Sequence, residues 1–301
     1  MSKWTIIGAA LAAALGAGAA SAEGFEQHVA ADAHGMVEIS NVNGRVDVEG
    51  WDRPEVYVRA PGSSKVEVTS APGHTSIRVV HSGPSLFGSG SVDLTVSVPK
   101  GSEVDVSAVS ADVKSAHVEG AQHLHTISGN IAADFGPGDL EVKTVSGDTS
   151  LKGPDETAQA RDTAEVPAVR ITSVSGDVSL QHGARTLEAQ SVSGDLAVQL
   201  GAVHSVRLRT TSGDLSFSGQ LEHGATLESE SVSGDLKLKV GGDDYAYEVS
   251  SFSGDINNCF GQEAQRVSAH GPGKRLSGTR GAGEGKVRVK SMSGDVSLCD
   301  H

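Results

Sequence analysis

Hydrophobic and polar residues alternate on both sides of a short motif, Ser-Gly-Asp, that recurs along the second half of the chain. Around Ser175, for example, apolar residues stand at Val169 and Ile171 before the motif and at Val178 and Leu180 after it. Alternation with a period of two on each side of a glycine-containing break is typical of strand, turn and strand. The pattern therefore predicts paired β-strands, and it requires no helix.

The motif recurs at nearly constant spacing. Full copies begin at Ser146, Ser175, Ser193, Ser212, Ser233, Ser253 and Ser293, and looser copies begin at Ser110 (Ser-Ala-Asp) and Ser128 (Ser-Gly-Asn). The successive intervals are 18, 18, 29, 18, 19, 21, 20 and 40 residues. A repeat this short cannot bury its own apolar face, so it must stack on its neighbours with equivalent residues about 4.8 Å apart.

These observations predict an all-β fold, a single-chain parallel β-solenoid with coils of 18 to 21 residues. A right-handed coil follows from the general rule for parallel crossovers. The alternative is an antiparallel sandwich, which also has evenly spaced strands. A sandwich gives no reason for the same motif to recur at every turn, whereas stacking does.

The position directly before the motif is also apolar, and we expect it to join the interior with the alternating positions. Its residues are Val109, Ile127, Val145, Val174, Val192, Val232, Phe252 and Met292.

The motif itself has a structural and a functional interpretation. Glycine supplies a positive φ at a tight turn, while Ser and Asp side chains hydrogen-bond nearby backbone. The predicted turn glycines are Gly147, Gly176, Gly194, Gly213, Gly234, Gly254 and Gly294. Alternatively, the Asp column gathers Ca²⁺, which favours several oxygen ligands; the candidate ligands are Asp177, Asp195, Asp214 and Asp235. The structural interpretation is favoured, because the nonapeptide repeat of Ca²⁺-binding β-rolls is missing.

Two interruptions of the period predict insertions in the solenoid. Residues 154–167 are polar and flanked by Pro, which is typical of a loop, and residues 261–285 are rich in Gly and basic residues. The predicted organisation is a signal peptide at 1–22, an N-terminal β region at 23–100 and the repeat solenoid at 101–301.

The first residues have the order of a secretory signal. Lys3 precedes an apolar run from Trp4 to Ala14, and Ala20-Ser21-Ala22 resembles a cleavage site. A buried N-terminal helix is the alternative. We expect cleavage after Ala22 and export to the periplasm, the cell surface or the medium. Because no later apolar run approaches the roughly 20 residues of a membrane-spanning helix, we expect no integral membrane segment after cleavage.

The two cysteines occupy equivalent positions, because Cys259 lies six residues after Ser253 and Cys299 six after Ser293. If the 40-residue interval is one enlarged coil, they lie on adjacent turns of the stack. Adjacent turns lie within the roughly 4.4 to 6.8 Å between Cα atoms that a disulfide accepts, and an oxidising compartment permits the bond. The alternative is two buried free thiols.

Composition and motifs narrow the function. The 24 basic and 38 acidic residues give a net charge of −14, which disfavours nucleic-acid binding. The chain lacks the Gly-x-Ser-x-Gly, His-Glu-x-x-His and phosphate-loop motifs. Among twelve histidines only His117, His123 and His125 are close together, which is weak evidence for a metal site. We expect no enzymatic activity, no catalytic residues and no cofactor, and no aromatic groove is evident.

Several stretches together resemble a known family. They are NVNGRVDVEGWDRPEVYV at 41–58, VDLTVSVPKGSEVDVSAVSADV at 92–113, the serial SVSGD copies, and INNCFG followed by SMSGDVSLC. They resemble the bacterial "putative adhesin" β-strand-repeat family, whose function is unknown. The resemblance covers essentially the whole mature chain. It implies a β-solenoid in the cell envelope, and some relatives are associated with envelope-stress signalling.

Three hypotheses of function follow. The preferred one is an exported, non-enzymatic envelope protein, adhesin-like or structural, whose solenoid face binds an envelope protein or a surface polymer. The alternatives are an envelope-stress accessory that binds another envelope protein, and a polysaccharide-active enzyme of the β-helix type. The sequence leaves the partner and the oligomeric state open.

Overall fold

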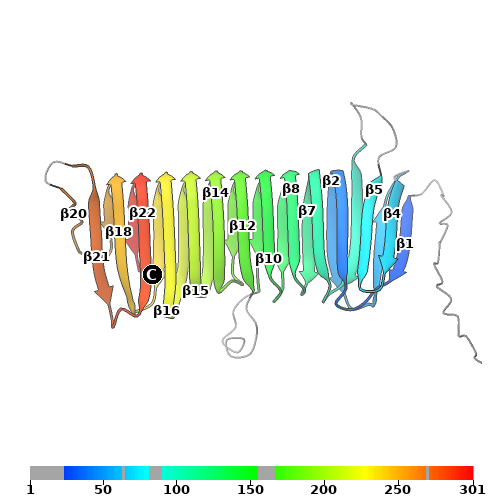
Figure 1. Cartoon of the computed structure of the whole chain (residues 1–301), viewed down its shortest axis with the longest axis horizontal. Helices are drawn as coiled ribbons and strands as arrows, with labels where there is room; N and C mark the ends of the chain where they lie inside the picture. Colours follow the sequence, from blue (N-terminus) through cyan, green and yellow to red (C-terminus); the bar gives the residue numbers. More distant parts are fainter. Residues whose placement is uncertain (1–23, 63–64, 81–89, 155–166, 269–270, 301) are drawn as a thin grey trace, which may run out of the picture.

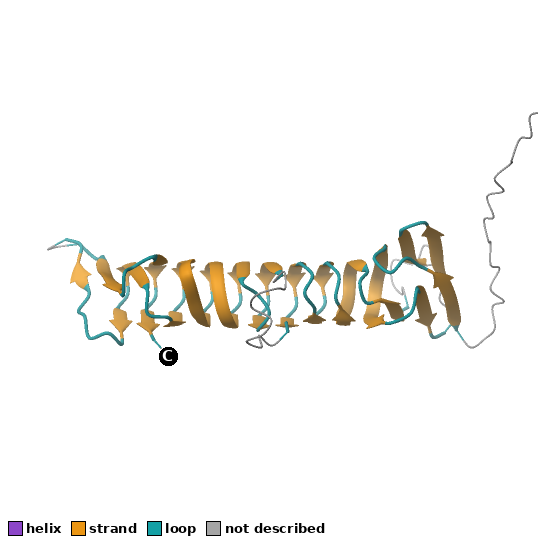
Figure 2. Cartoon of the chain, turned by 90° about the horizontal axis from the view of Figure 1, so that it is seen from below, coloured by secondary structure: helices purple, strands orange, loops and turns teal. Residues whose placement is uncertain are grey.

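The chain forms a long, straight stack of β-strands in two layers (Figures 1 and 2). The computed structural model describes residues 24–62, 65–80, 90–154, 167–268 and 271–300. The signal segment, residues 1–22, and most of the predicted 154–167 loop lie outside these residues. The described residues contain strands and no helix, which confirms the all-β prediction. The coil length, the right-handed sense and the division into regions stay predictions.

Each repeat contributes one strand to each layer. We call one repeat, with its strand pair and motif turn, a rung, and name it by the first residue of its motif. The first layer holds the strands that precede the motif, and the second layer holds those that follow it. Four long strands bend and belong to both layers: β2 (Met36–Trp51), β7 (Glu103–Val118), β15 (Leu196–Ser212) and β16 (Leu215–Ser233).

The remaining rungs use separate strands for the two layers. In the first layer these are β8 (Gln122–Ser128), β10 (Leu140–Ser146), β12 (Ala168–Ser175), β14 (Thr186–Ser193), β18 (Tyr245–Ser253) and β22 (Gly285–Ser293). In the second layer they are β9 (Ile131–Phe135), β11 (Thr149–Lys152), β13 (Val178–Gln181), β17 (Leu236–Gly241), β19 (Ile256–Asn258) and β23 (Val296–Cys299).

Neighbouring rungs pair in parallel with the motif residues in register. Ser146 lies opposite Ser128 and Ser175, and Ser193 lies opposite Ser175 and Ser212. The same register extends the column to Asn43 of β2, which lies opposite Ser110. The turn Asn43-Gly44-Arg45 is therefore a further rung, which the search for Ser-Gly-Asp did not find.

Antiparallel strands close both ends of the stack. At the N-terminal end these are β1 (Phe25–Ala30), β3 (Glu55–Ala60), β4 (Lys65–Ala71), β5 (His74–Val80) and β6 (Val92–Pro99), with β5 and β6 pairing in parallel with β2. At the other end β21 (Lys274–Arg280) pairs antiparallel with β18, and β20 (Gln265–Arg266) pairs with β21. Such covers keep unpaired strand edges from joining other chains.

The core consists of a single narrow region of mostly aliphatic side chains between the two layers of strands. In β12 the side chains of Val169 and Ile171 are buried, as are those of Val178 and Leu180 in β13. The inward position nearest the turn holds a small residue in most rungs, such as Ser173, which is buried. A two-layer interior this thin suits Val and Leu better than aromatic rings, which agrees with the 4% aromatic content.

The stack does not follow the order of the sequence at its C-terminal end. The rung of Ser293, formed by β22 and β23, lies between the rungs of Ser233 and Ser253 (Figure 1). The last two rungs are therefore stacked in the reverse of their sequence order. β18 and β19 form the terminal rung, β21 pairs with β18 on its outer side, and β22 and β23 lie between this terminal rung and the rung of Ser233. We call residues 285–299 the inserted rung.

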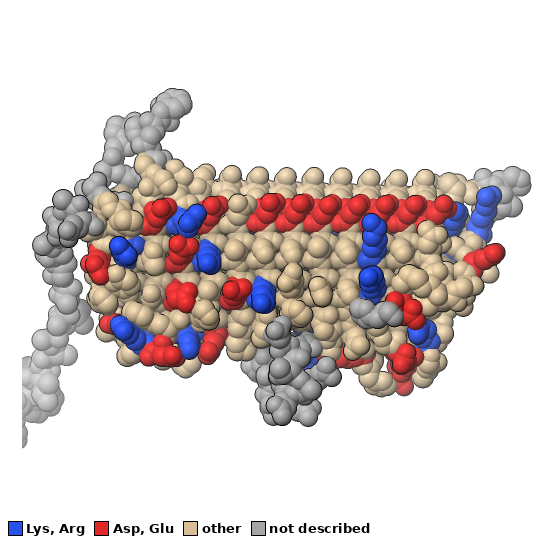
Figure 3. Space-filling model, turned by 180° about the vertical axis from the view of Figure 1, so that it is seen from behind, with Lys and Arg blue, Asp and Glu red and all other residues tan. Residues whose placement is uncertain are grey.

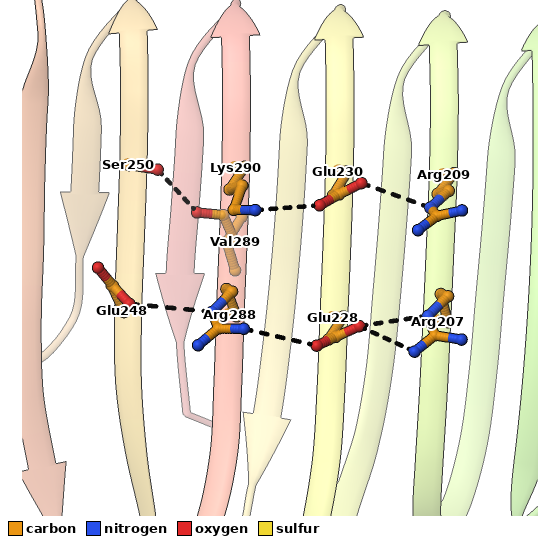
Figure 4. Close-up of polar contacts among 9 residues, drawn as sticks. All are labelled: Arg207, Arg209, Glu228, Glu230, Glu248, Ser250, Arg288, Val289 and Lys290. Carbon is orange, nitrogen blue, oxygen red and sulfur yellow. Dashed lines mark hydrogen bonds and ion pairs between the residues drawn. The ribbon is translucent and has the colours of Figure 1, made fainter.

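Charged side chains on the outer face of the first layer alternate in sign across the inserted rung (Figure 4). One row runs Arg207, Glu228, Arg288 and Glu248, with nitrogen to oxygen distances of 3.1, 3.7 and 3.9 Å. A second row runs Arg209, Glu230 and Lys290, at 3.4 and 3.3 Å. Stacking in sequence order would instead have set Glu228 beside Glu248, and opposed like charges destabilise a sheet.

Candidate interaction surface at the turn edge

The aspartates of the motif form a hydrogen-bonded ladder along the edge of the stack. Except in the terminal rung of Asp255, the Oδ1 atom of each Asp accepts the backbone N–H of the equivalent residue in the next rung, as from Asp195 N–H to Asp177 at 2.9 Å and from Asp214 N–H to Asp195 at 2.8 Å. The ladder contains Asp112, Asn130, Asp148, Asp177, Asp195, Asp214, Asp235, Asp295 and Asp255. This bonding supports the structural interpretation of the motif.

The ladder also explains the glycine in the motif. All seven predicted turn glycines have φ between 116° and 148°. At Gly194, a Cβ atom would lie 2.3 Å from the carbonyl oxygen of Gly176 in the preceding rung. The turns therefore stack too closely for any side chain, in a conformation that L-residues rarely adopt.

The carboxylates of the ladder form an acidic row on the surface that is interrupted at Asn130 (Figure 3). One oxygen of each carboxylate is used by the ladder. Whether Ca²⁺ binds to Asp177, Asp195, Asp214 and Asp235 stays a prediction.

The apolar position before the motif lies on the outside, so the expectation that it is buried was wrong. Strict alternation explains the error: with Val169, Ile171 and Ser173 inward, Val174 must point outward. The exposed residues, 41% to 61% exposed, are Val42, Val109, Ile127, Val145, Val174, Val192, Val232, Met292 and Phe252. Thr211 occupies the same position in the Ser212 rung. We call this set the apolar column.

The C-terminal half of the apolar column lies in a groove of about 960 Å³. The groove crosses six rungs, from Val174 to Phe252, and Val267 and Pro272 line it as well. Six rungs correspond to a length of roughly 24 Å. The surface therefore offers an elongated apolar site rather than a scatter of single exposed residues.

Ion-paired side chains border this groove. Arg209 and Lys290 both contact Glu230, which lies between them. Lys274, the first residue of β21, forms an ion pair with Asp255 of the ladder. The charges beside the groove are thus largely balanced, and its apolar floor is its distinguishing property.

His117, His123 and His125, which are close together in the sequence, form no group of three potential metal ligands in the described part of the chain. His117 contacts Glu49 at 2.7 Å, whereas His123 lies between Glu103 and Glu141 at 3.6 and 3.3 Å. Lys143, hydrogen-bonded to Glu141, holds the pKa of that carboxyl below its usual value, and His123 adds to the effect. These contacts make His123 a partner of carboxylates, as expected of a solvated outer face.

A different histidine lies within a potential ligand set. In the described part of the chain, the only group of three or more His, Cys, Asp or Glu residues whose ligand atoms all lie within 4.8 Å of one another is His223, Asp244 and Glu284. His223 lies 3.5 Å from Asp244 and 2.5 Å from Glu284. Asp244 Oδ1 also accepts the N–H groups of Gly283 and Glu284, at 2.6 and 3.1 Å. The N–H of Glu284 is the main cause of the lowered pKa of Asp244.

The N-terminal end carries an aromatic cluster that the sequence did not reveal. The Tyr57 ring lies 4.5 Å from that of His28 and 6.3 Å from that of Trp51, between centroids. Arg53 stacks over Trp51 at 4.8 Å. The Tyr57 hydroxyl donates to Glu26, which raises the pKa of Tyr57. β1 pairs antiparallel with β3, and β6 lies between β3 and the end of β2, antiparallel to the first and parallel to the second. Because this arrangement lies outside the repeat, no local pattern in the sequence predicts the cluster.

Cys259 and Cys299 form a disulfide, with their Cα atoms 4.9 Å apart. They lie at the ends of the neighbouring second-layer strands β19 and β23. The bond joins the terminal rung to the inserted rung.

The fold and this edge define a β-solenoid-like protein with repeated turn motifs and an exposed apolar column. The family model described as Toastrack DUF4097 matches residues 62–299, so the chain belongs to that family. This assignment confirms, at the level of an all-β family without a defined function, the resemblance found in the sequence. The Ser-Gly-Asp repeats are a feature of this chain. None of the curated proteins matches it.

Solved structures that match the chain include the following three. A "putative adhesin" from Bacteroides fragilis has 11% identity and a TM-score of 0.42, covering 92% of this chain and 98% of that one. A "putative lipid binding protein" from Parabacteroides distasonis has 12% identity and a TM-score of 0.34, covering 93% and 97%. A "putative adhesin" from Parabacteroides merdae has 10% identity and a TM-score of 0.26, covering 73% and 93%. Within the described ranges, no helix is long and apolar enough to span a membrane.

Proposed function

We propose that this is an exported, non-enzymatic cell-envelope protein that binds an envelope protein or a surface polymer along its apolar column. The observation that carries the proposal is the column itself. An exposed apolar residue at this position contributes nothing to the core, and Thr211 occupies the same position on the same outer face. A continuous exposed apolar surface is typical of an interaction site.

The acidic row supports a structural interpretation of the carboxylates and not a catalytic one. A retaining or inverting glycosidase needs two carboxyl groups in different environments. Here each Asp accepts a backbone N–H from the next rung, so neighbouring carboxylates share one environment. The role that fits this surface best is adhesion-like binding or a structural role in the envelope.

The disulfide and the predicted signal at 1–22 support export, because structural disulfides persist in oxidising compartments. The periplasm and the cell surface both satisfy this condition. An envelope-stress accessory role would use the same surface with another envelope protein as its partner.

The test compares two triple variants of the mature protein. Val174→Ser, Val192→Ser and Val232→Ser alter the column inside the groove, whereas Val109→Ser, Ile127→Ser and Val145→Ser alter it outside the groove. Each variant is used to capture proteins and polysaccharides from an envelope extract of the source cells. Loss of the captured partner in the first variant alone supports binding at the groove, and loss in both supports binding along the whole column.

Capture that is equal in both variants and in the unaltered protein would refute the proposed surface. The same preparations are incubated with a panel of acidic and neutral glycans. Cleavage that a single carboxylate substitution abolishes would show an enzyme instead. Changed envelope-stress reporters after deletion of the gene, with unchanged surface attachment, would favour the accessory role over adhesion.

A further inference from the structure

The inserted rung holds the end of the solenoid together. β22 pairs with β16 on one side and with β18 on the other, and β23 likewise lies between β17 and β19. No strand pairing joins β18 or β19 directly to β16 or β17 in the described chain. By strand pairing, residues 245–280 therefore join the stack through the inserted rung, and the Tyr245 hydroxyl also donates to the carbonyl oxygen of Val240 in β17.

Two connections cross where the inserted rung begins. Residues 242–244 lead from β17 to β18, past the place of the inserted rung, and residues 281–284 lead from β21 back into it. Asp244 lies in the first connection and accepts the N–H groups of Gly283 and Glu284 in the second. Connections at one edge of a sheet rarely cross. The connections cross here because residues 285–299 lie between two rungs, those of Ser233 and Ser253, that both come earlier in the sequence.

The inserted rung is held by backbone hydrogen bonds, by its buried side chains Val287, Val289, Val296 and Leu298, by exposed ion pairs and by one covalent bond. The ion pairs of Arg288 and Lys290 are half-exposed and individually weak. The covalent bond is Cys259–Cys299, at the C-terminal end of the rung. When this bond is broken, the only covalent attachment of the rung to the preceding chain is residues 281–284, and its non-covalent contacts are ones that the same rung of a second copy can also make.

The inserted rung pairs with the edges of β16 and β17 on one side and of β18 and β19 on the other, and every copy of the chain has these edges. Residues 285–299 of a second copy would make the same ladder bonds and the same ion pairs. Exchange of an identical element between copies conserves all contacts, so it is a low-cost route to a dimer. The disulfide favours the arrangement in which the inserted rung stays in its own chain, because it bonds Cys299 of that rung covalently to Cys259 of the same chain.

We propose that residues 285–299 form an exchangeable rung, that the Cys259–Cys299 bond retains it, and that reduction of this bond by a dithiol opens its place to the same rung of a second copy. In the reduction, a thiolate of the dithiol attacks one sulfur of the Cys259–Cys299 bond, which breaks and leaves a mixed disulfide, and the second thiolate then attacks this mixed disulfide and releases the protein cysteine. Two electrons and two protons pass to Cys259 and Cys299, and the dithiol becomes a disulfide.

The test uses the full-length mature protein and a fluorescent synthetic peptide of residues 285–301 that carries Cys299→Ser. The protein is incubated with the peptide in the oxidised form, with dithiothreitol, and as the double variant Cys259→Ser, Cys299→Ser. Incorporation of the peptide is followed by size-exclusion chromatography, and dimers by light scattering. We expect incorporation and dimers in the reduced protein and in the double variant, and at least tenfold less in the oxidised protein.

A charge substitution tests that the inserted rung is the element that exchanges. In the double-variant background, Arg288→Glu places a third carboxylate between Glu228 and Glu248. The matched control, Arg170→Glu, places one between Glu141 and Glu188 in a rung that follows sequence order. We expect Arg288→Glu to speed incorporation of the unaltered peptide about tenfold, from weakened cross-strand pairs. Arg170→Glu should leave the rate unchanged.

Three outcomes would overturn the proposal: equal incorporation with and without the disulfide, no incorporation and no dimer in the reduced protein, or equal acceleration by Arg170→Glu. Hydrogen exchange of the reduced wild-type protein covers the case in which the double variant does not fold. There we expect residues 285–299 to lose protection before β12 and β14. Simultaneous loss of protection in all these strands would also overturn the proposal.

Discussion

The guanidinium of Arg288 lies 3.7 Å from the carboxylate of Glu228, in the neighbouring strand of the first layer. This contact sets the last repeat of the sequence beside the repeat of Ser233, ahead of the repeat of Ser253. Arg288 also contacts Glu248 on its other side, at 3.9 Å. The signs of the charges on three strands thus agree with a spatial order that differs from the order of the chain.

Asp214 provides a test of the ladder. Replacement by Ala removes the acceptor of the Asp235 N–H, which should destabilise the protein by about 1 kcal/mol. Replacement by Asn should be tolerated, because Asn130 already accepts the N–H of Asp148 in the same column. Urea unfolding of the two variants measures the difference. Equal destabilisation by Asn and Ala would show that the negative charge, and not the hydrogen bond, is required.

Gly194 tests the close approach of the turns. Its Cβ would lie 2.3 Å from the oxygen of Gly176, so Gly194→Ala should cost more than about 3 kcal/mol. Gly224, with φ of 71°, has no atom within 4 Å of an added Cβ. Gly224→Ala should therefore cost only the backbone term, about 1 to 2 kcal/mol. Both variants are compared with the unaltered protein by urea unfolding. Equal losses of unfolding free energy in Gly194→Ala and Gly224→Ala would show that backbone conformation alone, and not the close approach of the turns, requires glycine in the motif.

Val142 and Val145, both on β10, test the assignment of inner and outer positions. Val142 is fully buried and Val145 is 47% exposed. The same change to Thr should cost about 1 to 3 kcal/mol at Val142, where the hydroxyl is buried. At Val145 it should cost less than about 0.5 kcal/mol and should lower the binding of an apolar dye. A larger loss of stability at Val145 would mean that the apolar column has a role in folding.

Much of the architecture is predictable because a repeat states the same information many times. The alternation around Ser175, Ser193 and Ser212 indicates strand, turn and strand, and the constant spacing indicates stacking. The outward direction of Val174 was also present in the pattern, since it lies an odd number of positions from Val169 and Ile171. The hydrophobicity of Val174 alone suggests burial, but side chains alternate between the two faces of a strand, so Val174 lies on the outer face.

The inserted rung and the aromatic cluster are not predictable from the repeat. Equivalent rungs have nearly equal apolar patterns, so the pattern does not tell whether the Ser293 rung lies outside or inside that of Ser253. The available signal is the sign of the outward charges, Glu228, Glu248 and Arg288, which requires the register to be known first. The contact between Trp51 and Tyr57 depends on antiparallel strands that the Ser-Gly-Asp period does not describe.

The crossing of the two connections should weaken in acid because of Asp244. Hydrogen bonding from the backbone N–H of Glu284 lowers the pKa of Asp244 below its usual value, and the N–H of Gly283 and the charge of His223 add to the effect. A carboxyl with a lowered pKa in the folded state contributes stability above its pKa in the unfolded chain, and this contribution is lost as the pH falls through the folded pKa. Asp244→Asn should therefore be less stable than the unaltered protein near neutral pH.

That difference should shrink below about pH 4 and vanish once Asp244 is protonated in both states. Urea unfolding of both proteins across the acid range measures it. Asp134→Asn is the matched control, since Asp134 is an exposed residue of β9 whose carboxylate accepts no hydrogen bond among the described residues. A pH-independent difference for Asp244→Asn, or an equal pH dependence for Asp134→Asn, would show that the ionised carboxylate of Asp244 does not hold the crossing together.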